Sequence, residues 1–344
     1  MENLNEILNK DSFTKDEIVL LLKLTETKDI QKLYNKAKEI REKYFGNQIH
    51  LRGIIEFSNY CRQDCTYCGI RNSNKFVERF RMSKNEIISV ANQIYEAGIK
   101  TIVLQSGEDL HFQKENIAEI ITEIKSQFDV AITLSLGERA FGDYDLWRNC
   151  GADRYLLKHE TANIEIYKQI HPYQKLENKI AHLKYLKSIG FQIGSGNIIG
   201  LPNQTIKDIA DDILLCNQLD VDMASFSPFI KAENTPLANN SNGNLSLLLK
   251  TMAVARILLK NVHIPSTTAL ATLDELGREK GILAGANVIM PSFTPYPYKG
   301  NYLIYENKKC ISENPQMCLP CLNLRLSSIF VTASDSHGHS LKFK

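Results

Sequence analysis

The feature that most constrains the fold is a repeated alternation of short apolar runs with longer amphipathic stretches from Leu51 onward. Such alternation is typical of βα units, in which each strand of a parallel sheet is followed by a covering helix. Eight runs are predicted as strands: 53–57, 101–105, 131–135, 153–158, 194–199, 223–226, 263–267 and 287–290. Helices are predicted at 84–97, 114–126, 175–188, 206–219 and 245–259, where apolar residues return every three or four positions.

Eight βα units over about 240 residues fit a (β/α)8 TIM barrel, for which roughly 250 residues is typical. A doubly wound open sheet is the alternative, because it produces the same alternation with fewer strands. We expect three parts: an N-terminal helical cap over 1–46, the barrel over 47–290, and a C-terminal extension over 291–344. Within the cap, Thr14 with Glu17 three residues later predicts a helix start.

The overall composition indicates a globular protein that acts on a small molecule. Hydrophobic residues make up 43% and charged residues 23% of the chain, as in ordinary globular proteins. A net charge of +2 without a basic block argues against nucleic acid as a partner. The first residues are polar and no apolar run reaches membrane-spanning length, so we expect no membrane association and a cytoplasmic location.

Six of the eight cysteines are clustered. In a reducing compartment, clustered cysteines are more often metal or redox centres than disulfides. Cys150 and Cys216 stand alone on helical patterns and are interpreted as small buried hydrophobes. Cys61, Cys65 and Cys68 form a CxxxCxxC motif directly after the first predicted strand.

This cysteine triad is suited to an iron–sulfur cluster. Thiolates are soft ligands that such clusters prefer, and three of them leave one iron of a [4Fe–4S] cluster open for a cofactor. The alternative of a structural zinc site fits less well, because zinc normally takes four protein ligands. Unliganded core cysteines are also disfavoured, since the triad follows a barrel strand at the end where active sites lie.

With Tyr67 before its last cysteine, the motif resembles that of the radical S-adenosylmethionine (SAM) superfamily. The resemblance implies that Cys61, Cys65 and Cys68 hold the catalytic [4Fe–4S] cluster. It further implies that SAM binds the open iron and is cleaved after one-electron reduction to methionine and a 5′-deoxyadenosyl radical. In such enzymes the cofactors carry the chemistry, and the protein orients them.

Other segments match the places where this superfamily binds SAM. Ser106-Gly107-Glu108 stands where the family carries a Gly-Gly-Glu-like segment, with Ser106 in place of the first glycine, and residues 196–200 are similar to its GxIxG segment. Polar turns and turn glycines are the plainer interpretation of both. The residues expected at the cofactor are Tyr67, Gln105, Ser106, Gly107, Glu108, Glu160, Lys179, Gly196, Ile198, Met223 and Met290.

Seven further runs occur in order along the chain: TIVLQSGED, TLSLGE, ADRYLL, HETAN, GLPNQTI, TPLAN and GANVIMP. Through these runs, nearly the whole chain resembles the HydE family of [FeFe]-hydrogenase maturases. Methylornithine synthase and biotin synthase are further relatives. The resemblance implies a role in making the diiron subcluster of the hydrogenase H-cluster from an anionic or organometallic substrate. It also implies a reductant such as ferredoxin or flavodoxin, and HydG and HydF as partner maturases. A lysine mutase like methylornithine synthase and a non-catalytic Fe–S scaffold remain alternatives.

By the same resemblance, the substrate is expected near Thr133, Lys158, Lys179, Thr267, Thr268 and Tyr302. Members of the family carry arginines at the positions of Lys158 and Lys179. A lysine supplies charge without the bidentate fork of arginine, so the pose of an anion is open here.

A second cysteine group lies in the extension, where Cys310, Cys318 and Cys321 are spaced Cx7CxxC. It resembles the auxiliary Fe–S site of some hydrogenase maturases, which implies a second [2Fe–2S] or [4Fe–4S] cluster. An adventitious metal site or a zinc knuckle is the alternative.

Overall fold

The computed structural model describes residues 4–311 and 315–343, and only the backbone of residues 315–318. Its centre is a parallel sheet of six strands in the order β2-β3-β4-β5-β6-β7. These strands are β2 (Gly53–Ser58), β3 (Thr101–Ser106), β4 (Ala131–Ser135), β5 (Arg154–Leu156), β6 (Gln192–Ile199) and β7 (Met223–Pro228). Each is followed by at least one helix before the next strand begins, so the predicted βα alternation is confirmed.

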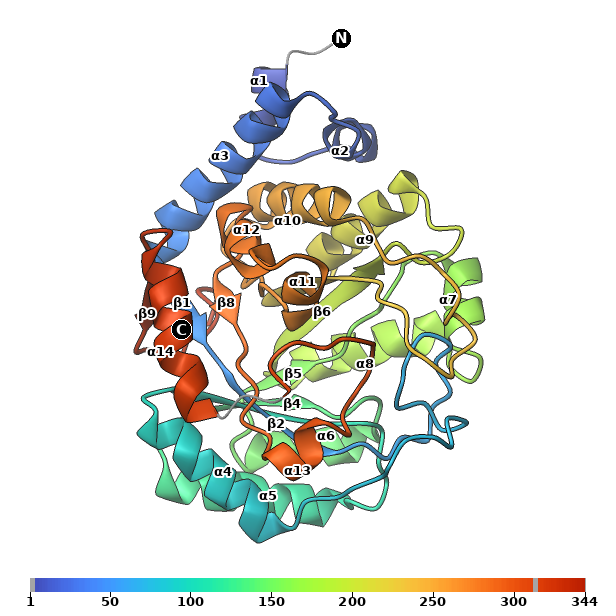
Figure 1. Cartoon of the computed structure of the whole chain (residues 1–344), viewed down its shortest axis with the longest axis vertical. Helices are drawn as coiled ribbons and strands as arrows, with labels where there is room; N and C mark the ends of the chain where they lie inside the picture. The colour runs from blue at the N-terminus through green and yellow to red at the C-terminus, as the bar shows by residue number, and fades with distance from the viewer. Residues whose placement is uncertain (1–3, 312–314, 344) are drawn as a thin grey trace.

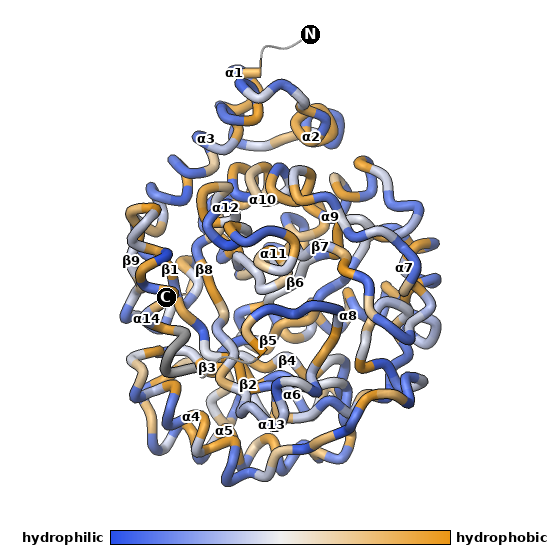
Figure 2. The backbone as a smooth tube through the Cα atoms, viewed as in Figure 1, coloured by the Kyte–Doolittle hydropathy of each residue, from blue (hydrophilic) through white to orange (hydrophobic). Residues whose placement is uncertain are grey.

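Helices surround this sheet (Figure 1). They are α1 (Leu4–Leu8), α2 (Lys15–Leu22), α3 (Thr27–Phe45), α4 (Lys84–Glu96), α5 (Lys114–Gln127), α6 (Phe141–Asn149), α7 (Ile164–Ile170), α8 (Leu176–Ser188), α9 (Ile206–Gln218), α10 (Leu245–Leu259), α11 (Thr268–Leu273), α12 (Gly277–Leu283), α13 (Tyr296–Lys299) and α14 (Pro315–Ser327). Apolar and polar residues alternate along α4 and α5, whereas α10 is largely apolar (Figure 2). This difference follows burial, because α10 is buried from Leu248 to Leu259.

The prediction of a regular strand at 263–267 is wrong. That segment makes only two isolated bridges, from His263 to Met223 of β7 and from Pro265 to Val288. Proline has no N–H to donate, so Pro265 interrupts the ladder that would define a central strand. The predicted eighth strand is present but short, as β8 (Val288–Ile289).

Two strands were not predicted from the sequence. β1 (Gln48–Leu51) and β9 (Thr332–Ser334) join β8 in a separate parallel sheet of order β8-β1-β9. After β8, the chain returns to β2, where Ile54 N donates to Pro291 O at 2.9 Å and Phe293 N donates to Ile54 O at 2.8 Å. The predicted α/β fold with a parallel, barrel-like sheet is therefore confirmed. A closed barrel of eight regular strands is not seen in the described residues, because isolated bridges at His263, Pro265 and Ser292 stand where further strand pairing was expected.

The N-terminal cap consists of α1, α2 and α3. α1 and α2 lie at one end of the molecule beyond α10, and α3 runs from there along the side of the molecule toward β1 (Figure 1). α2 begins at a capping box in which Thr14 accepts from Glu17 N and the Glu17 carboxylate accepts from Thr14 N, as the sequence predicted. None of the described helices is long and apolar enough to cross a membrane. The proposed boundaries of the three parts at 46 and 290 stay a prediction.

Candidate active site

A cavity of about 370 Å³ opens at the carboxyl ends of the strands, where barrel enzymes bind their ligands. Most residues expected at the cofactor or the substrate line it together. These are Cys61, Cys65, Tyr67, Cys68, Gln105, Ser106, Gly107, Glu108, Lys158, Glu160, Lys179, Ile198, Thr267, Thr268, Met290 and Tyr302. Segments far apart in the sequence thus converge on one space.

The loop that carries Cys61, Cys65 and Cys68, called the cysteine loop below, follows β2 and is held in shape by two arginines. Arg71 Nε donates to Asp64 Oδ1 at 2.7 Å, inside the loop. Arg79 reaches back across it and donates to the carbonyl oxygens of Ile70 at 2.8 Å and Arg71 at 2.7 Å. These bonds replace the backbone pairing that a strand or helix would supply.

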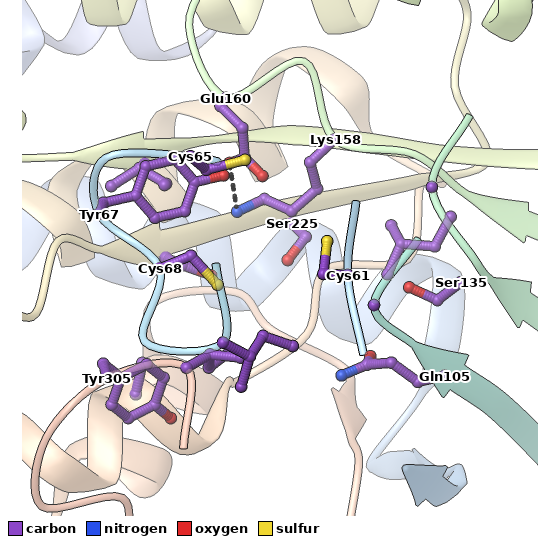
Figure 3. Close-up of a pocket in the computed structure, with 18 of the residues that line it drawn as sticks. Cys61, Cys65, Tyr67, Cys68, Gln105, Ser135, Lys158, Glu160, Ser225 and Tyr305 are labelled. Atoms are coloured by element: carbon purple, nitrogen blue, oxygen red, sulfur yellow. Dashed lines mark ion pairs between the residues drawn. The ribbon is translucent and has the colours of Figure 1, made fainter. Parts of the chain in front are cut away.

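The three thiols of the loop face the same space as Lys158 and Glu160 (Figure 3). Burial raises the pKa of Cys61, Cys65 and Cys68, the last to about 12, so the thiols are protonated without a metal. Iron supplies the positive charge that stabilises the thiolate form. The set fits the cluster of the superfamily, because soft sulfur ligands from one loop line a single cavity.

The zinc alternative fits the geometry less well. Within the described ranges 4–311 and 315–343, no three His, Cys, Asp or Glu side chains are placed so that they could hold one metal ion. A zinc ion needs its ligands around one point, whereas a four-iron cluster takes each thiolate on a different iron.

Glu108 is the most heavily bonded carboxylate of the cavity wall. Its oxygens accept from Arg62 Nε at 3.0 Å, Gln63 Nε2 at 2.6 Å, Gln174 Nε2 at 3.1 Å and Glu138 N at 3.0 Å. These bonds fix the side chain between the cysteine loop and the segment after β4.

Two lysines of the cavity are already paired. Lys158 Nζ lies 3.0 Å from Glu160 Oε2, and Lys179 Nζ lies 3.0 Å from Glu138 Oε1. The first pair is an ion pair without hydrogen-bond geometry, so Glu160 Oε2 lacks a hydrogen bond. Glu160 adopts a positive φ of 63°, and its backbone bridges to Asn197 of β6.

Buried polar atoms without a partner mark where a polar ligand fits. Among the cavity-lining side chains that the structure describes, Glu160 Oε2, His171 Nε2 and Thr267 Oγ1 have no hydrogen-bond partner. Buried polar atoms are ordinarily paired. The three atoms offer acceptors and a hydroxyl donor, which suit the amine, carboxylate and hydroxyl groups of SAM or of a second small molecule.

Three predicted residues do not line this cavity, and these placements correct the sequence-based expectation. Thr133 and Met223 line a separate cavity of about 10 Å³, where Arg52 Nη1 lies 3.0 Å from Met223 Sδ. Both residues lie too far from the carboxyl end of their strand to reach the large cavity. The residues two positions further along, Ser135 after Thr133 and Ser225 after Met223, do line it. A Cβ on Gly196 would lie 1.9 Å from Ser225 O, so this glycine serves the contact between β6 and β7.

Sequence reasoning missed several lining residues: Glu56, Ser135, His171, Gln174, Ser225, Ser227, Tyr305 and Lys308. The serines could have been found, because they follow the period of two at the carboxyl ends of β4 and β7. Lys308 could not. It comes from the C-terminal extension and donates to Glu56 Oε1 at 2.5 Å, a pairing across 252 positions that no local pattern signals.

Cys310 and Cys321 of the second cysteine group do not line the cavity. Cys310 Sγ accepts a long contact of 3.8 Å from Arg278 Nη2, and Cys321 is exposed on α14. The side chain of Cys318 lies outside the described residues. An auxiliary cluster on these cysteines stays a prediction.

Comparisons with known proteins agree with this geometry. The family model of the radical SAM superfamily matches residues 55–216. The [FeFe] hydrogenase maturase subunit HydE of Thermotoga maritima is 44% identical over 317 residues, which cover 92% of this chain and 91% of that protein. The 3-methylornithine synthase of Methanosarcina acetivorans is 29% identical and covers 86% of this chain and 85% of its own length.

Solved structures show the same fold. A crystal structure of methylornithine synthase superposes with a TM-score of 0.86 at 24% identity and covers 96% of this chain and 97% of that one. A crystal structure of HydG, a maturase of the [FeFe]-hydrogenase, superposes with a TM-score of 0.83 at 20% identity and covers 97% of this chain and 75% of that one. At these identities the likeness establishes the fold alone.

Fold and site thus define a radical SAM enzyme, a class that uses a [4Fe–4S] cluster and SAM. Identity over nearly the full length of both chains narrows the class further. The chain belongs to the family of the [FeFe] hydrogenase maturase subunit HydE. The family and the enzyme class predicted from the sequence are confirmed.

Proposed function

We propose that this chain holds its [4Fe–4S] cluster on Cys61, Cys65 and Cys68, binds SAM in the adjoining cavity, and acts in the maturation of the diiron subcluster of [FeFe] hydrogenase. The observation that carries the proposal is the convergence of the three thiols on the cavity that Lys158 and Glu160 also line. Full-length similarity to a hydrogenase maturase supports the biological role.

When bound, the cluster and SAM supply a one-electron reductive cleavage that yields methionine and a 5′-deoxyadenosyl radical, with the electron coming from a reductant such as ferredoxin or flavodoxin. The residues of the chain bind and orient. Glu160 Oε2 accepts from an amine or hydroxyl of SAM, and Glu108 keeps the cysteine loop in register with the segment after β4. The buried side chains of Ile198, Phe229 and Tyr302 on the cavity wall limit the access of water to the radical.

The substrate proposed for the same cavity is an anionic or organometallic small molecule. Three lysines, Lys158, Lys179 and Lys308, and three glutamates, Glu56, Glu108 and Glu160, line the cavity, so formal charges balance before any ligand enters. An anion therefore binds by drawing a lysine away from its carboxylate, with Thr267 and Thr268 supplying hydroxyl groups. We further propose that HydG and HydF are partners of this chain and that it acts in the cytoplasm.

The auxiliary site belongs to the proposal as well. Cys310 and Cys321 both lie close enough to Arg325 to raise the pKa of that guanidinium, after the larger effect of its hydrogen bond to Glu279. Two members of the second cysteine group therefore lie near one cationic side chain. A cluster held there lies outside the cavity and serves a role other than SAM cleavage.

The experiment is anaerobic reconstitution with iron and sulfide, followed by reduction with dithionite in the presence of SAM. We expect 5′-deoxyadenosine and methionine from the unaltered chain and neither from the Cys61→Ala, Cys65→Ala or Cys68→Ala variants. Cys150→Ala is the matched control, because Cys150 is half-buried at the end of α6, away from the cavity. Joint replacement of the second cysteine group is expected to lower iron content and leave cleavage intact.

A second assay tests the biological role. The chain is expected to restore hydrogenase activity in a host that lacks its own HydE. Formation of 3-methylornithine from lysine would assign the chain to the lysine mutase alternative, and a reduced cluster without SAM cleavage would leave only the scaffold alternative.

A further inference from the structure

His171 makes a side-chain contact that the proposed reaction does not yet use. Its Nδ1 lies 3.2 Å from Cys65 Sγ, and both residues line the cavity. The imidazole is buried, with 4% of the residue exposed, at the carboxyl end of α7. Neither its position in the sequence nor a motif singled it out.

Helix α7 and the cysteine loop together hold the imidazole ring of His171 in place. His171 N donates to Tyr167 O at 2.8 Å, and Thr66 N of the cysteine loop donates to Ile170 O at 3.0 Å, so the backbone joins α7 to the loop. The imidazole packs against the Tyr167 ring at 4.6 Å between centroids and meets the Tyr67 ring edge-on at 5.7 Å. Packing on both sides leaves Nδ1 directed at the sulfur.

The chemistry of the sulfur decides which atom is the donor. A cysteine that ligates iron does so as a thiolate, which only accepts hydrogen bonds. Nδ1 must therefore carry the hydrogen, which leaves Nε2 as an acceptor in the neutral ring. By contrast, Cys61 Sγ accepts from the backbone N–H of Glu108 at 3.4 Å, a contact that does not depend on the side chain.

We propose that His171 is a positioning residue of the cluster, whose Nδ1–H donates to the Cys65 thiolate and raises the reduction potential of the cluster. The inference rests on the proposed ligation by Cys65. Reduction adds one negative charge to the cluster, part of which resides on its sulfurs, so a hydrogen-bond donor stabilises the reduced state more than the oxidised state. The bond also fixes the rotamer of the ligand, as outer-shell partners of metal ligands do.

Two variants separate this hydrogen bond from packing. His171→Phe keeps a ring between the two tyrosines and removes the donor, whereas His171→Asn offers an amide N–H near the place of Nδ1. An EPR-monitored redox titration of the reconstituted cluster, without SAM, measures the potential. We expect about a threefold lower ratio of reduced to oxidised cluster at fixed potential for His171→Phe, which is about 28 mV at 59 mV per tenfold change. His171→Asn is expected to recover most of the shift.

The control is His111→Phe, because His111 is exposed after β3 and does not line the cavity. An unchanged potential in His171→Phe would overturn the proposal, and equal shifts in the Phe and Asn variants would assign the effect to packing. A third measurement needs no stable Phe variant. In unaltered protein with ¹⁵N-labelled histidine, ENDOR of the reduced cluster is expected to show a histidine nitrogen coupling, and its absence would overturn the proposal.

Failure of the ligand assignment gives a different result. If Cys65 does not hold iron, Cys65→Ala keeps its full cluster content. If only the hydrogen bond is wrong, Cys65→Ala loses the cluster while the potential of the His171 variants stays at that of the unaltered chain.

Discussion

At the residue scale, the glycines of the site are needed for close contacts within the chain. Gly107 lines the cavity, as the sequence predicted. In the structure, a Cβ at this position would lie 2.3 Å from Tyr60 O and 2.8 Å from Cys61 Cβ. The close approach is therefore to the cysteine loop, and the glycine determines how tightly that loop packs on the end of β3.

This packing makes Gly107→Ala a sharp test. The added methyl collides with backbone, which cannot rotate away as a side chain can, so we expect a loss of about 1–3 kcal/mol in unfolding free energy. Iron content after reconstitution is expected to fall as well, because the shift falls on Cys61. Urea denaturation and iron analysis measure the two effects. Gly142→Ala is the control, since a Cβ there meets nothing within 4 Å. Equal iron content in both variants would refute the packing role.

At the scale of elements, local chemistry sets where several helices begin. Capping boxes start α2 at Thr14, α4 at Ser83 and α9 at Thr205, each with an acidic residue three positions later. The observed starts of α4, α5, α9 and α10 coincide with those predicted from periodicity. The regular strand expected at 263–267 does not form for an equally local reason, because Pro265 has no N–H to donate.

The cap of α4 can be measured directly. Ser83→Ala removes the oxygen that accepts from Glu86 N at 3.3 Å, and we expect a loss of about 1 kcal/mol of stability in urea denaturation. Ser126→Ala, at an exposed position near the end of α5, is the control and is expected to change stability by less than about 0.5 kcal/mol. A smaller effect of Ser83→Ala than of the control would contradict the assignment of the cap.

At the scale of the whole molecule, the C-terminal tail covers the end of the barrel opposite the cavity. β9 pairs with β1, and the residues after it supply acceptors to cations at the starts of other strands. Arg154 Nη2 donates to His337 O at 2.6 Å, and Arg52 Nη2 donates to Gly338 O at 3.4 Å. Two buried guanidinium groups are thereby partly satisfied by backbone carbonyls rather than by carboxylates.

Because of the histidines at this covered end, we expect the folded chain to lose stability in acid. Burial lowers the pKa of His50 and His339 from 6.5 to about 4. Between these values the unfolded chain binds more protons than the folded chain, so stability falls as pH drops from 6.5 towards 4. For His50 the loss reaches up to about 3 kcal/mol at 1.36 kcal/mol per pKa unit. His339 is only partly buried, and its contribution is smaller because solvent screens the exposed part of the ring.

The measurement is urea denaturation at pH 7.0, 6.0 and 5.0 for the unaltered chain and for His50→Gln. The variant is expected to show a flatter dependence of unfolding free energy on pH. His111→Gln, at an exposed position, should keep the full slope, and an unchanged slope in His50→Gln would remove His50 as the cause.

The sequence by itself determined the alternation of strands and helices, the helix starts, the cysteine loop after the first barrel strand and the family. Each depends on residues close together in the chain: a hydrophobic period, a capping box, or three thiols within eight positions. For the same reason, Glu108, Lys158 and Glu160 could be anticipated at the cavity as residues that follow strand ends.

The tertiary structure alone decided which further side chains share the cavity and which predicted ones do not. Thr133 and Met223 lie two residues before the positions of their strands that line the cavity. Lys308 reaches Glu56 from a segment 252 positions away. The contact of His171 with Cys65 spans 106 positions and depends on how α7 ends against the cysteine loop. Depth in a barrel and contacts across it arise from the packing of whole elements, which no local pattern encodes.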